Sequence, residues 1–159
     1  MFKNILVPID GSRTSDLGLD EAIKLAKNQE ATLYLLHVVD DHALLQSAAT
    51  TSESTFIDGL LEALRGNGKK IIAEAEAKVR KQDIRSKSIL IENLGSRISD
   101  LILNQVRELN ADLIVLGTHG RRGVRRLVMG SDAEGVVRET TVPVLLVRST
   151  ALPMSETGK

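Results

Sequence analysis

The chain has 159 residues, and its 21 Lys and Arg side chains are balanced by 21 Asp and Glu side chains. This length suits one domain with a single core, and a net charge of zero argues against a nucleic-acid-binding protein, which ordinarily presents a basic surface. Aromatic residues make up only 2 %, too few to stack the bases of a single strand, and the absence of cysteine excludes disulfides, thiolate chemistry and cysteine-ligated metals.

Apolar runs and amphipathic helical patterns alternate along the chain. In chain order, the patterns predict a strand at 5–7, a helix at 14–28, a strand at 32–39, a long helix at about 56–79, a strand at 86–92, a helix at about 98–109, a strand at 112–116, a short helix at about 132–139 and a strand at 144–147. Gly66-Asn67-Gly68 interrupts the long helical pattern, and we expect a kink or a break into two pieces there.

Five strands separated by helices predict an α/β fold with a doubly wound parallel sheet. We expect one domain over residues 1–148 and a loose tail at 149–159. Ligands of such folds bind beyond the carboxyl ends of the strands, where the strand order reverses. The segments expected to carry function are therefore Pro8–Ser12, Val39–Asp41, Leu94–Arg97 and Gly117–Ser131.

Compartment follows from what the chain lacks. No apolar run approaches the roughly 20 residues that a membrane-spanning helix needs, and the first residues lack the basic and then apolar pattern of a secretory signal. The absence of cysteine fits a reducing compartment. We therefore expect a cytoplasmic protein that binds neither a membrane nor a nucleic acid.

The connection Gly117–Gly130 is long for a strand-to-helix loop and carries arginines at 121, 122, 125 and 126. A glycine-rich turn that leads into a helix N-terminus favours binding of an anion such as a nucleotide phosphate. A long connection with glycines at turn positions is the alternative, and the residues alone leave both open. Ser131 and Glu134 have the spacing of a capping box, which predicts Ser131 as the N-cap.

Polar side chains elsewhere have two interpretations each. Asp10 could accept hydrogen bonds from a ribose or an adenine amine, or satisfy its own turn, and the residue alone favours the turn. The Val39 backbone could pair with a base edge. We expect His37 to be a hydrogen-bonded core residue and His119 to be structural. Asp40-Asp41-His42 is better explained by a solvated lid than by a metal site, because no partner cluster appears elsewhere.

Taken together, these residues resemble the universal stress proteins. Nucleotide-binding members carry the motif G-x2-G-x9-G-[S/T], and Gly117, Gly120, Gly130 and Ser131 match its spacing. The run 5–12, Ile-Leu-Val-Pro-Ile-Asp-Gly-Ser, is similar to the family's first strand and turn, and 35–39 and 142–147 are similar to its second and last strands. The resemblance covers residues 2–148.

The resemblance implies the strand order 3-2-1-4-5 of the adenine nucleotide alpha hydrolase-like fold. It also implies that Asp10 and the Val39 backbone hold an adenosine, and that the glycines of the motif and Ser131 hold its ribose and phosphates. With the neighbouring residues of these segments, the expected nucleotide site consists of Pro8, Ile9, Asp10, Ser12, Val39, Gly117, Gly120, Arg121, Gly130 and Ser131.

The ligand implied is ATP, or AMP or ADP, together with Mg²⁺ or Mn²⁺. Asp132 follows the Gly-Ser pair, where many nucleotide-binding relatives have an apolar residue. Its carboxylate suits the helix dipole, but it could either repel a triphosphate or help to hold a phosphate-bound magnesium ion. The sequence leaves these two roles of Asp132, and the choice among the nucleotides, open.

The last strand predicts a homodimer, which the resemblance also implies. An uncharged apolar edge strand invites pairing with a second chain, although Pro143 and Arg148 could blunt this edge. The expected contact residues are Val142, Val144, Leu145, Leu146 and Val147.

The function expected is a nucleotide-dependent regulatory dimer of the stress response, in which ATP orders the 121–129 loop and biases a surface for a protein partner. A slow ATPase or phosphotransfer enzyme is the first alternative, but the chain has no Walker or kinase signature. At most, weak hydrolysis is expected. A phosphoacceptor receiver domain needs an acidic acceptor at the end of its third strand and a lysine after its fifth, and this chain has neither. A dimeric scaffold that binds no nucleotide is the last alternative, and the intact glycine motif argues against it.

Overall fold

The computed structural model describes residues 1–40, 54–118 and 129–148. In this part, five parallel strands form one sheet in the order β3-β2-β1-β4-β5, which confirms the predicted topology. The strands are β1 (Asn4–Pro8), β2 (Thr32–Asp40), β3 (Ser86–Asn93), β4 (Leu113–Gly117) and β5 (Val144–Val147).

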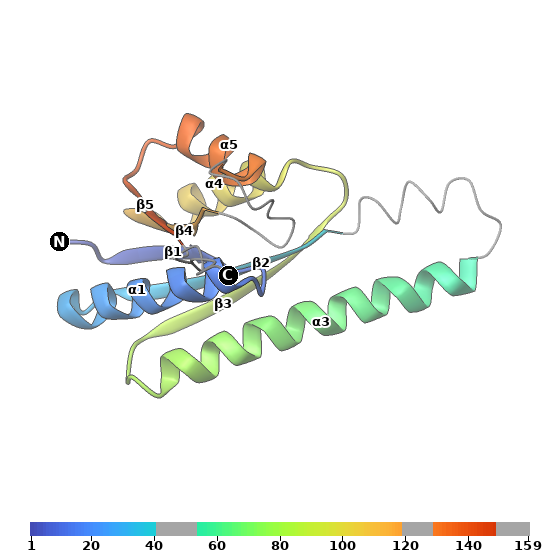
Figure 1. Cartoon of the computed structure of the whole chain (residues 1–159), viewed down its shortest axis with the longest axis horizontal. Helices are drawn as coiled ribbons and strands as arrows, with labels where there is room; N and C mark the ends of the chain where they lie inside the picture. Colours follow the sequence, from blue (N-terminus) through green and yellow to red (C-terminus); the bar gives the residue numbers. More distant parts are fainter. Residues whose placement is uncertain (41–53, 119–128, 149–159) are drawn as a thin grey trace, which may run out of the picture.

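Helices cover both faces of this sheet (Figure 1). The described helices are α1 (Arg13–Gln29), α3 (Ser54–Arg80), α4 (Ile98–Glu108) and α5 (Ser131–Glu139). α1 and α3 pack on one face, and α4 and α5 pack on the other, each pair with its own cluster of buried apolar side chains. This arrangement confirms the doubly wound α/β class. None of the described helices combines the length and the apolar character needed to cross a membrane.

The two clusters follow from the alternation of side chains along each strand. In β2, Leu33 and Leu35 are buried against α1 and α3, whereas Tyr34 and Leu36 are buried against α4 and α5. Because both faces are covered, the central strands are almost entirely apolar.

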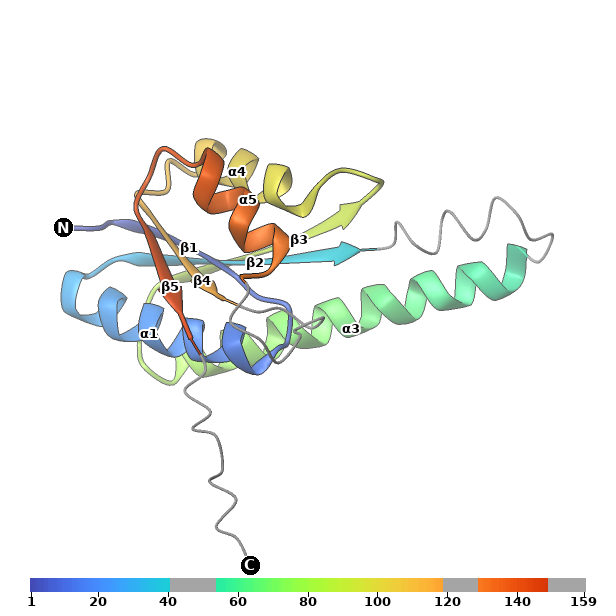
Figure 2. The ribbon, with the colours of Figure 1, turned by 45° about the horizontal axis from the view of Figure 1, so that its top comes forward.

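α3 is one continuous helix, so of the kink or break expected at Gly66-Asn67-Gly68, the break into two pieces is wrong. Gly68 is needed for packing rather than for a turn: a Cβ there would lie 2.9 Å from Cδ2 of His37 and 3.0 Å from Cγ2 of Val39. The glycine therefore lets the helix approach β2 closely. The N-terminal part of α3 extends past the carboxyl end of β2, as both views show (Figure 2).

α5 also begins differently from the prediction. Gly130 is the N-cap, Ser131 is the first helical residue, and no side chain caps this end. The Glu134 carboxylate pairs instead with Arg138 one turn later, at 2.8 Å. The predicted capping box is therefore wrong, because an i,i+4 ion pair along the helix takes the carboxylate that the box would need.

Candidate functional site

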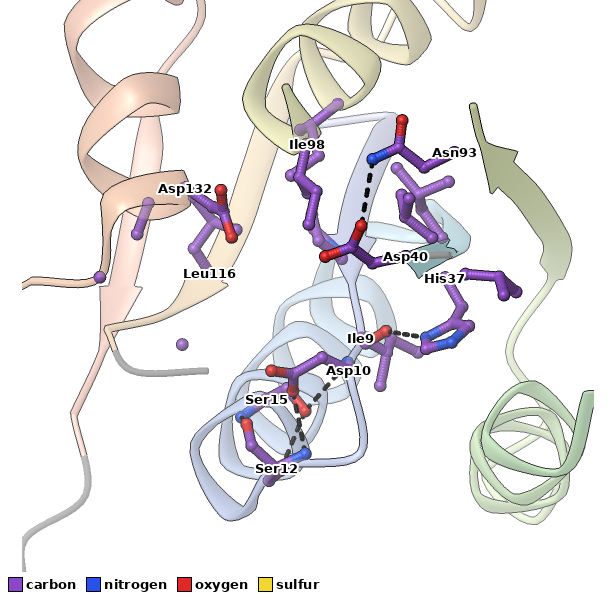
Figure 3. Close-up of a pocket in the computed structure, with 18 of the residues that line it drawn as sticks. Ile9, Asp10, Ser12, Ser15, His37, Asp40, Asn93, Ile98, Leu116 and Asp132 are labelled. Carbon is purple, nitrogen blue, oxygen red and sulfur yellow. Dashed lines mark hydrogen bonds between the residues drawn. The ribbon is translucent and has the colours of Figure 1, made fainter. Parts of the chain in front are cut away.

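A cavity of about 790 Å³ opens beyond the carboxyl ends of β1, β2 and β4 (Figure 3). Chain connections lead away from β1 and β4 in opposite directions, which makes this the point where the strand order reverses. Each expected site residue within the described part lines the cavity: Pro8, Ile9, Asp10, Ser12, Val39, Gly117, Gly130 and Ser131. Gly120 and Arg121 lie outside the described residues, as do His119, the Asp41-His42 pair and the tail.

The turn between β1 and α1 supplies one wall. Gly11 has a φ of 78°, which a residue without a Cβ adopts at little cost. The Ser12 N–H donates to Oδ1 of Asp10 at 2.9 Å, and the Ser12 hydroxyl caps α1 by accepting the Ser15 N–H at 3.1 Å. Asp10 thus satisfies its own turn, as expected for the residue alone. A carboxylate can accept about four hydrogen bonds, so this turn is compatible with a ligand contact.

His37 also lines the cavity, beside this turn (Figure 3). Its side chain is only 5 % exposed, and Nδ1 lies 2.6 Å from the carbonyl oxygen of Ile9. A carbonyl can only accept, so Nδ1 is the donor. The prediction of a hydrogen-bonded core histidine is confirmed.

The backbone of β2 presents hydrogen-bonding groups at the same place. Leu36 accepts from Ile9, on the β1 side, whereas Leu33 donates to Arg85, on the β3 side. Successive residues of a strand direct their N–H and C=O groups to opposite sides, so Val38 points toward β1 and Val39 toward β3.

The pairing of β2 with β1 and its pairing with β3 end at different residues of β2. Pairing with β1 stops at Pro8↔Leu36, but pairing with β3 continues to Asp40↔Asn93. The N–H and C=O of Val38 therefore face the space that β1 has left. The backbone of Val39, expected to contact a base edge, is directed toward β3, and this direction follows only from the register of the sheet.

Asn93 is a lining residue that sequence reasoning missed. Its side chain is 2 % exposed, and its Oδ1 accepts the N–H groups of Gly95 and Ser96 at 3.1 and 2.8 Å. Its amide donates to the Ser96 carbonyl at 2.9 Å and reaches the Asp40 carboxylate at 3.5 Å. The available signal was an Asn two residues before a Gly at a strand end, which is typical of an Asx turn.

The N-terminus of α5 forms the opposite wall. The Gly130 N–H donates to the Thr118 carbonyl at 3.0 Å and so ties together the two ends of the long connection. Among the described residues, a Cβ on Gly130 would meet one atom within 4 Å, that carbonyl oxygen at 3.8 Å. The cavity lies in front of the helix and is bordered by the first-turn N–H groups of Ser131 and Ala133, which have no intrahelical acceptor.

Gly117 has a different surrounding. A Cβ there would lie 2.7 Å from the backbone carbon of Thr14 and 2.9 Å from the Ser15 nitrogen. This glycine lets the end of β4 approach the first turn of α1, so the protein itself requires it.

Charges around the cavity are unequal. Among the described lining residues there are three carboxylates, on Asp10, Asp40 and Asp132, and one guanidinium, on Arg97. Arg97 lies 3.5 Å from Glu139 on α5. Within the described part of the chain, no group of three or more His, Asp or Glu side chains could hold a metal ion.

Comparisons with known proteins agree with this architecture. The model of the "Universal stress protein family" matches residues 1–148. Universal stress protein YxiE of Bacillus subtilis is 34 % identical over 151 residues, which are 93 % of this chain and 100 % of that protein. The structure of universal stress protein UspA from Lactobacillus plantarum is 26 % identical, with a TM-score of 0.76 and coverage of 92 % of this chain and 97 % of the other.

Two more distant structures share the fold and contain nucleotides. A universal stress protein in complex with cAMP is 20 % identical with a TM-score of 0.63, over 92 % of this chain and 97 % of the other. One from Archaeoglobus fulgidus in complex with dAMP is 21 % identical with a TM-score of 0.62, over 91 % of this chain and 97 % of the other. From the family match over nearly its whole length and from its curated relatives, this chain belongs to the universal stress protein family.

Proposed function

We propose that the protein binds an adenine mononucleotide, ATP or else AMP or ADP, in the cavity at the carboxyl ends of the strands. One observation carries the proposal: the N-terminus of α5 borders the cavity, and among the described residues the Cβ position of Gly130 has no atom closer than 3.8 Å. A helix N-terminus attracts phosphate through its unpaired N–H groups and its dipole. The relatives that hold cAMP and dAMP support an adenine ligand.

The proposed pose uses the polar groups on both walls. The N–H and C=O of Val38 match the acceptor N1 and the amino group on the Watson–Crick edge of adenine. Asp10 accepts from the ribose hydroxyls. Gly130 and Ser131 take the phosphates. Gly120 and Arg121, on the segment 119–128, are proposed to complete the phosphate contacts.

The charge of the described lining sets a condition on the phosphates. Three carboxylates against one guanidinium repel a triphosphate. The helix N-terminus, the arginines of segment 119–128 and a phosphate-bound divalent cation offset that repulsion. We therefore propose that ATP binds as its Mg²⁺ or Mn²⁺ complex and that Asp132 lies close to that cation.

The proposed biological unit is a regulatory dimer. β5 pairs only with β4 within the described sheet, and Leu145 and Leu146 on it are exposed. Pairing two such edges about a two-fold axis covers both. Nucleotide occupancy would then bias the surface that the dimer offers to a protein partner.

Isothermal titration calorimetry tests the nucleotide assignment. We expect Mg·ATP and AMP to bind and GTP to bind at least tenfold more weakly, because its Watson–Crick edge reverses the donor and acceptor that Val38 needs. Removal of Mg²⁺ with EDTA should lower the affinity for ATP about tenfold and leave the affinity for AMP unchanged. Gly130→Ala should weaken Mg·ATP by about tenfold, whereas Gly66→Ala, in open space on α3, should not. If the wild type binds no adenine nucleotide, the proposal is wrong.

A further inference from the structure

β2 extends beyond the end of β1, although the register would allow one more rung of the ladder. The last bond between them runs from the Ile9 N–H to the Leu36 carbonyl at 2.7 Å. In a parallel ladder, the next bond would run from the Val38 N–H to the Ile9 carbonyl. That carbonyl instead accepts from Nδ1 of His37, at 2.6 Å.

The imidazole thus occupies the position of the missing rung. It belongs to the residue just before Val38, and its side chain is directed to the α1 and α3 face of the sheet while the Val38 backbone points toward β1. Figure 3 shows the ring reaching back from β2 to the Ile9 carbonyl, beside the turn that carries Asp10 and Ser12.

We propose that His37 is a positioning residue that ends the β1–β2 ladder one rung early and thereby keeps the Val38 N–H and C=O open for the base. This inference rests on the proposed nucleotide site, and it assigns to His37 the role of keeping the backbone groups that would bind the base accessible. A free backbone pair at a sheet edge would otherwise be satisfied by its neighbour strand, because buried N–H and C=O groups are almost always paired.

α3 holds the ring in this position. A Cβ on Gly68 would lie 2.9 Å from Cδ2 and 3.2 Å from Nε2 of His37. The backbone of the helix thus packs against the imidazole on the side where any larger residue would place its Cβ. We therefore include Gly68 in the proposal: it allows α3 to pack against the His37 ring, which explains why a glycine stands within a continuous helix.

A matched pair of substitutions separates the hydrogen bond from the volume of the ring. His37→Asn retains an N–H donor at the position of Nδ1, and His37→Leu has the same branching without a donor. In His37→Leu the Ile9 carbonyl loses its partner, and the Val38 N–H is the group placed to replace it. Chemical denaturation of both variants reports whether each is folded.

Amide hydrogen exchange measured by NMR without nucleotide gives the first result. The Val38 amide should exchange fast in the wild type and in His37→Asn, and at least tenfold more slowly in His37→Leu, where the added rung protects it. Equal, fast exchange in all three proteins would overturn the inference, and a general loss of packing would speed exchange rather than slow it.

Calorimetric titration of the same proteins with Mg·ATP gives the second result. His37→Asn should bind within about threefold of the wild type, and His37→Leu about tenfold more weakly, the effect of one lost hydrogen bond to the base. Equal affinity in His37→Leu and the wild type would contradict the inference while leaving the proposed function intact. If the wild type itself fails to bind, the proposed function falls, and the exchange rates alone then decide whether His37 ends the ladder.

The role of α3 has its own control on the same helix. Gly68→Ala should displace the ring and weaken Mg·ATP to a similar extent as His37→Leu. Gly66→Ala, whose Cβ would meet no atom of the described residues within 4 Å, should bind like the wild type. Unchanged affinity for Mg·ATP in Gly68→Ala would show that α3 does not help to position His37.

Discussion

Gly117 and Gly130 both border the cavity, but a Cβ would meet very different surroundings at the two positions. At Gly117 it would collide with the backbone of Thr14, and at Gly130 it would lie 3.8 Å from its nearest neighbour among the described residues. The spacing of the glycine motif identifies both positions without telling them apart. Only the packing of β4 against α1 shows that the first glycine is required by the fold.

Stability measurements distinguish these two glycines. Gly117→Ala should lower the free energy of unfolding by about 1–3 kcal/mol, because the backbone of α1 must shift to admit the methyl group. Gly130→Ala should change it by less than about 0.5 kcal/mol. Urea unfolding followed by circular dichroism gives both values. A Gly117→Ala protein as stable as the wild type would contradict the packing argument.

At the scale of elements, α3 illustrates how a tertiary contact overrides a local signal. Two glycines separated by an asparagine are typical of a break, yet the helix continues because Gly68 is packed against β2. Gly66 has no such contact and only weakens the helix.

Replacement of the exposed Gly66 should therefore stabilise the protein. Gly66→Ala should raise the free energy of unfolding by about 0.5–1 kcal/mol, since alanine loses less backbone entropy in a helix. Thermal and urea unfolding should both show the increase. No gain, or a loss, would mean that the helix is not continuous through this position in solution.

Lys78 joins α3 to α1. Its Nζ lies 2.7 Å from Asp16 and 2.8 Å from Asp20, both on α1. Burial lowers the pKa of Lys78, but hydrogen bonds to these two carboxylates and their charges outweigh burial, so that the pKa is raised above its ordinary value. The folded state thus holds this proton more tightly than the unfolded chain does.

The stability from this ion pair should depend on pH in one direction. A raised pKa contributes stability that is fully present below the ordinary lysine value and is lost as the pH rises through the folded one. Lys78→Met should cost about 1 kcal/mol at pH 7, and its difference from the wild type should shrink above about pH 10.5. Urea unfolding at pH 7 to 11 measures it. Lys69→Met, on the same helix at an exposed site, should cost nothing at any pH, and a pH-independent deficit in Lys78→Met would point to packing instead.

At the scale of the whole molecule, the described sheet has two edge strands, β3 and β5. β3 and β5 each have one strand partner within the described residues. Leu90 on β3 and Leu145 on β5 are both 36 % exposed, which gives a matched pair for testing the proposed dimer.

We expect Leu145→Lys to convert the dimer to a monomer, because a charge at the centre of a paired edge must be desolvated or repel its copy. Leu90→Lys should leave the dimer intact. Sedimentation equilibrium at several concentrations measures both. A dimer in Leu145→Lys together with a monomer in Leu90→Lys would move the interface to the opposite edge.

Much of this architecture could be predicted from the sequence, because buried parallel strands leave continuous apolar runs and α/β connections follow few topologies. The alternation of strands and helices, the sheet order through the family resemblance, and His37 as a core residue are all confirmed. The predicted start of α5 is wrong by one residue, and the Glu134 carboxylate expected in a capping box pairs with Arg138 on the same helix instead. The assignment of backbone groups to Val38 needed the register, because a shift of one residue reverses the direction of every N–H.

The central position of β1 has a consequence for how the chain is made. Of the five described strands β1 is synthesised first, and its two neighbours in the sheet begin at Thr32 and Leu113. Some 80 residues must be translated between these partners, which takes roughly 4–16 s at about 5–20 residues per second. During that interval the edge of β1 that later pairs with β4 lacks its strand partner, so a chaperone that recognises unpaired strand edges would have to act before β4 is translated.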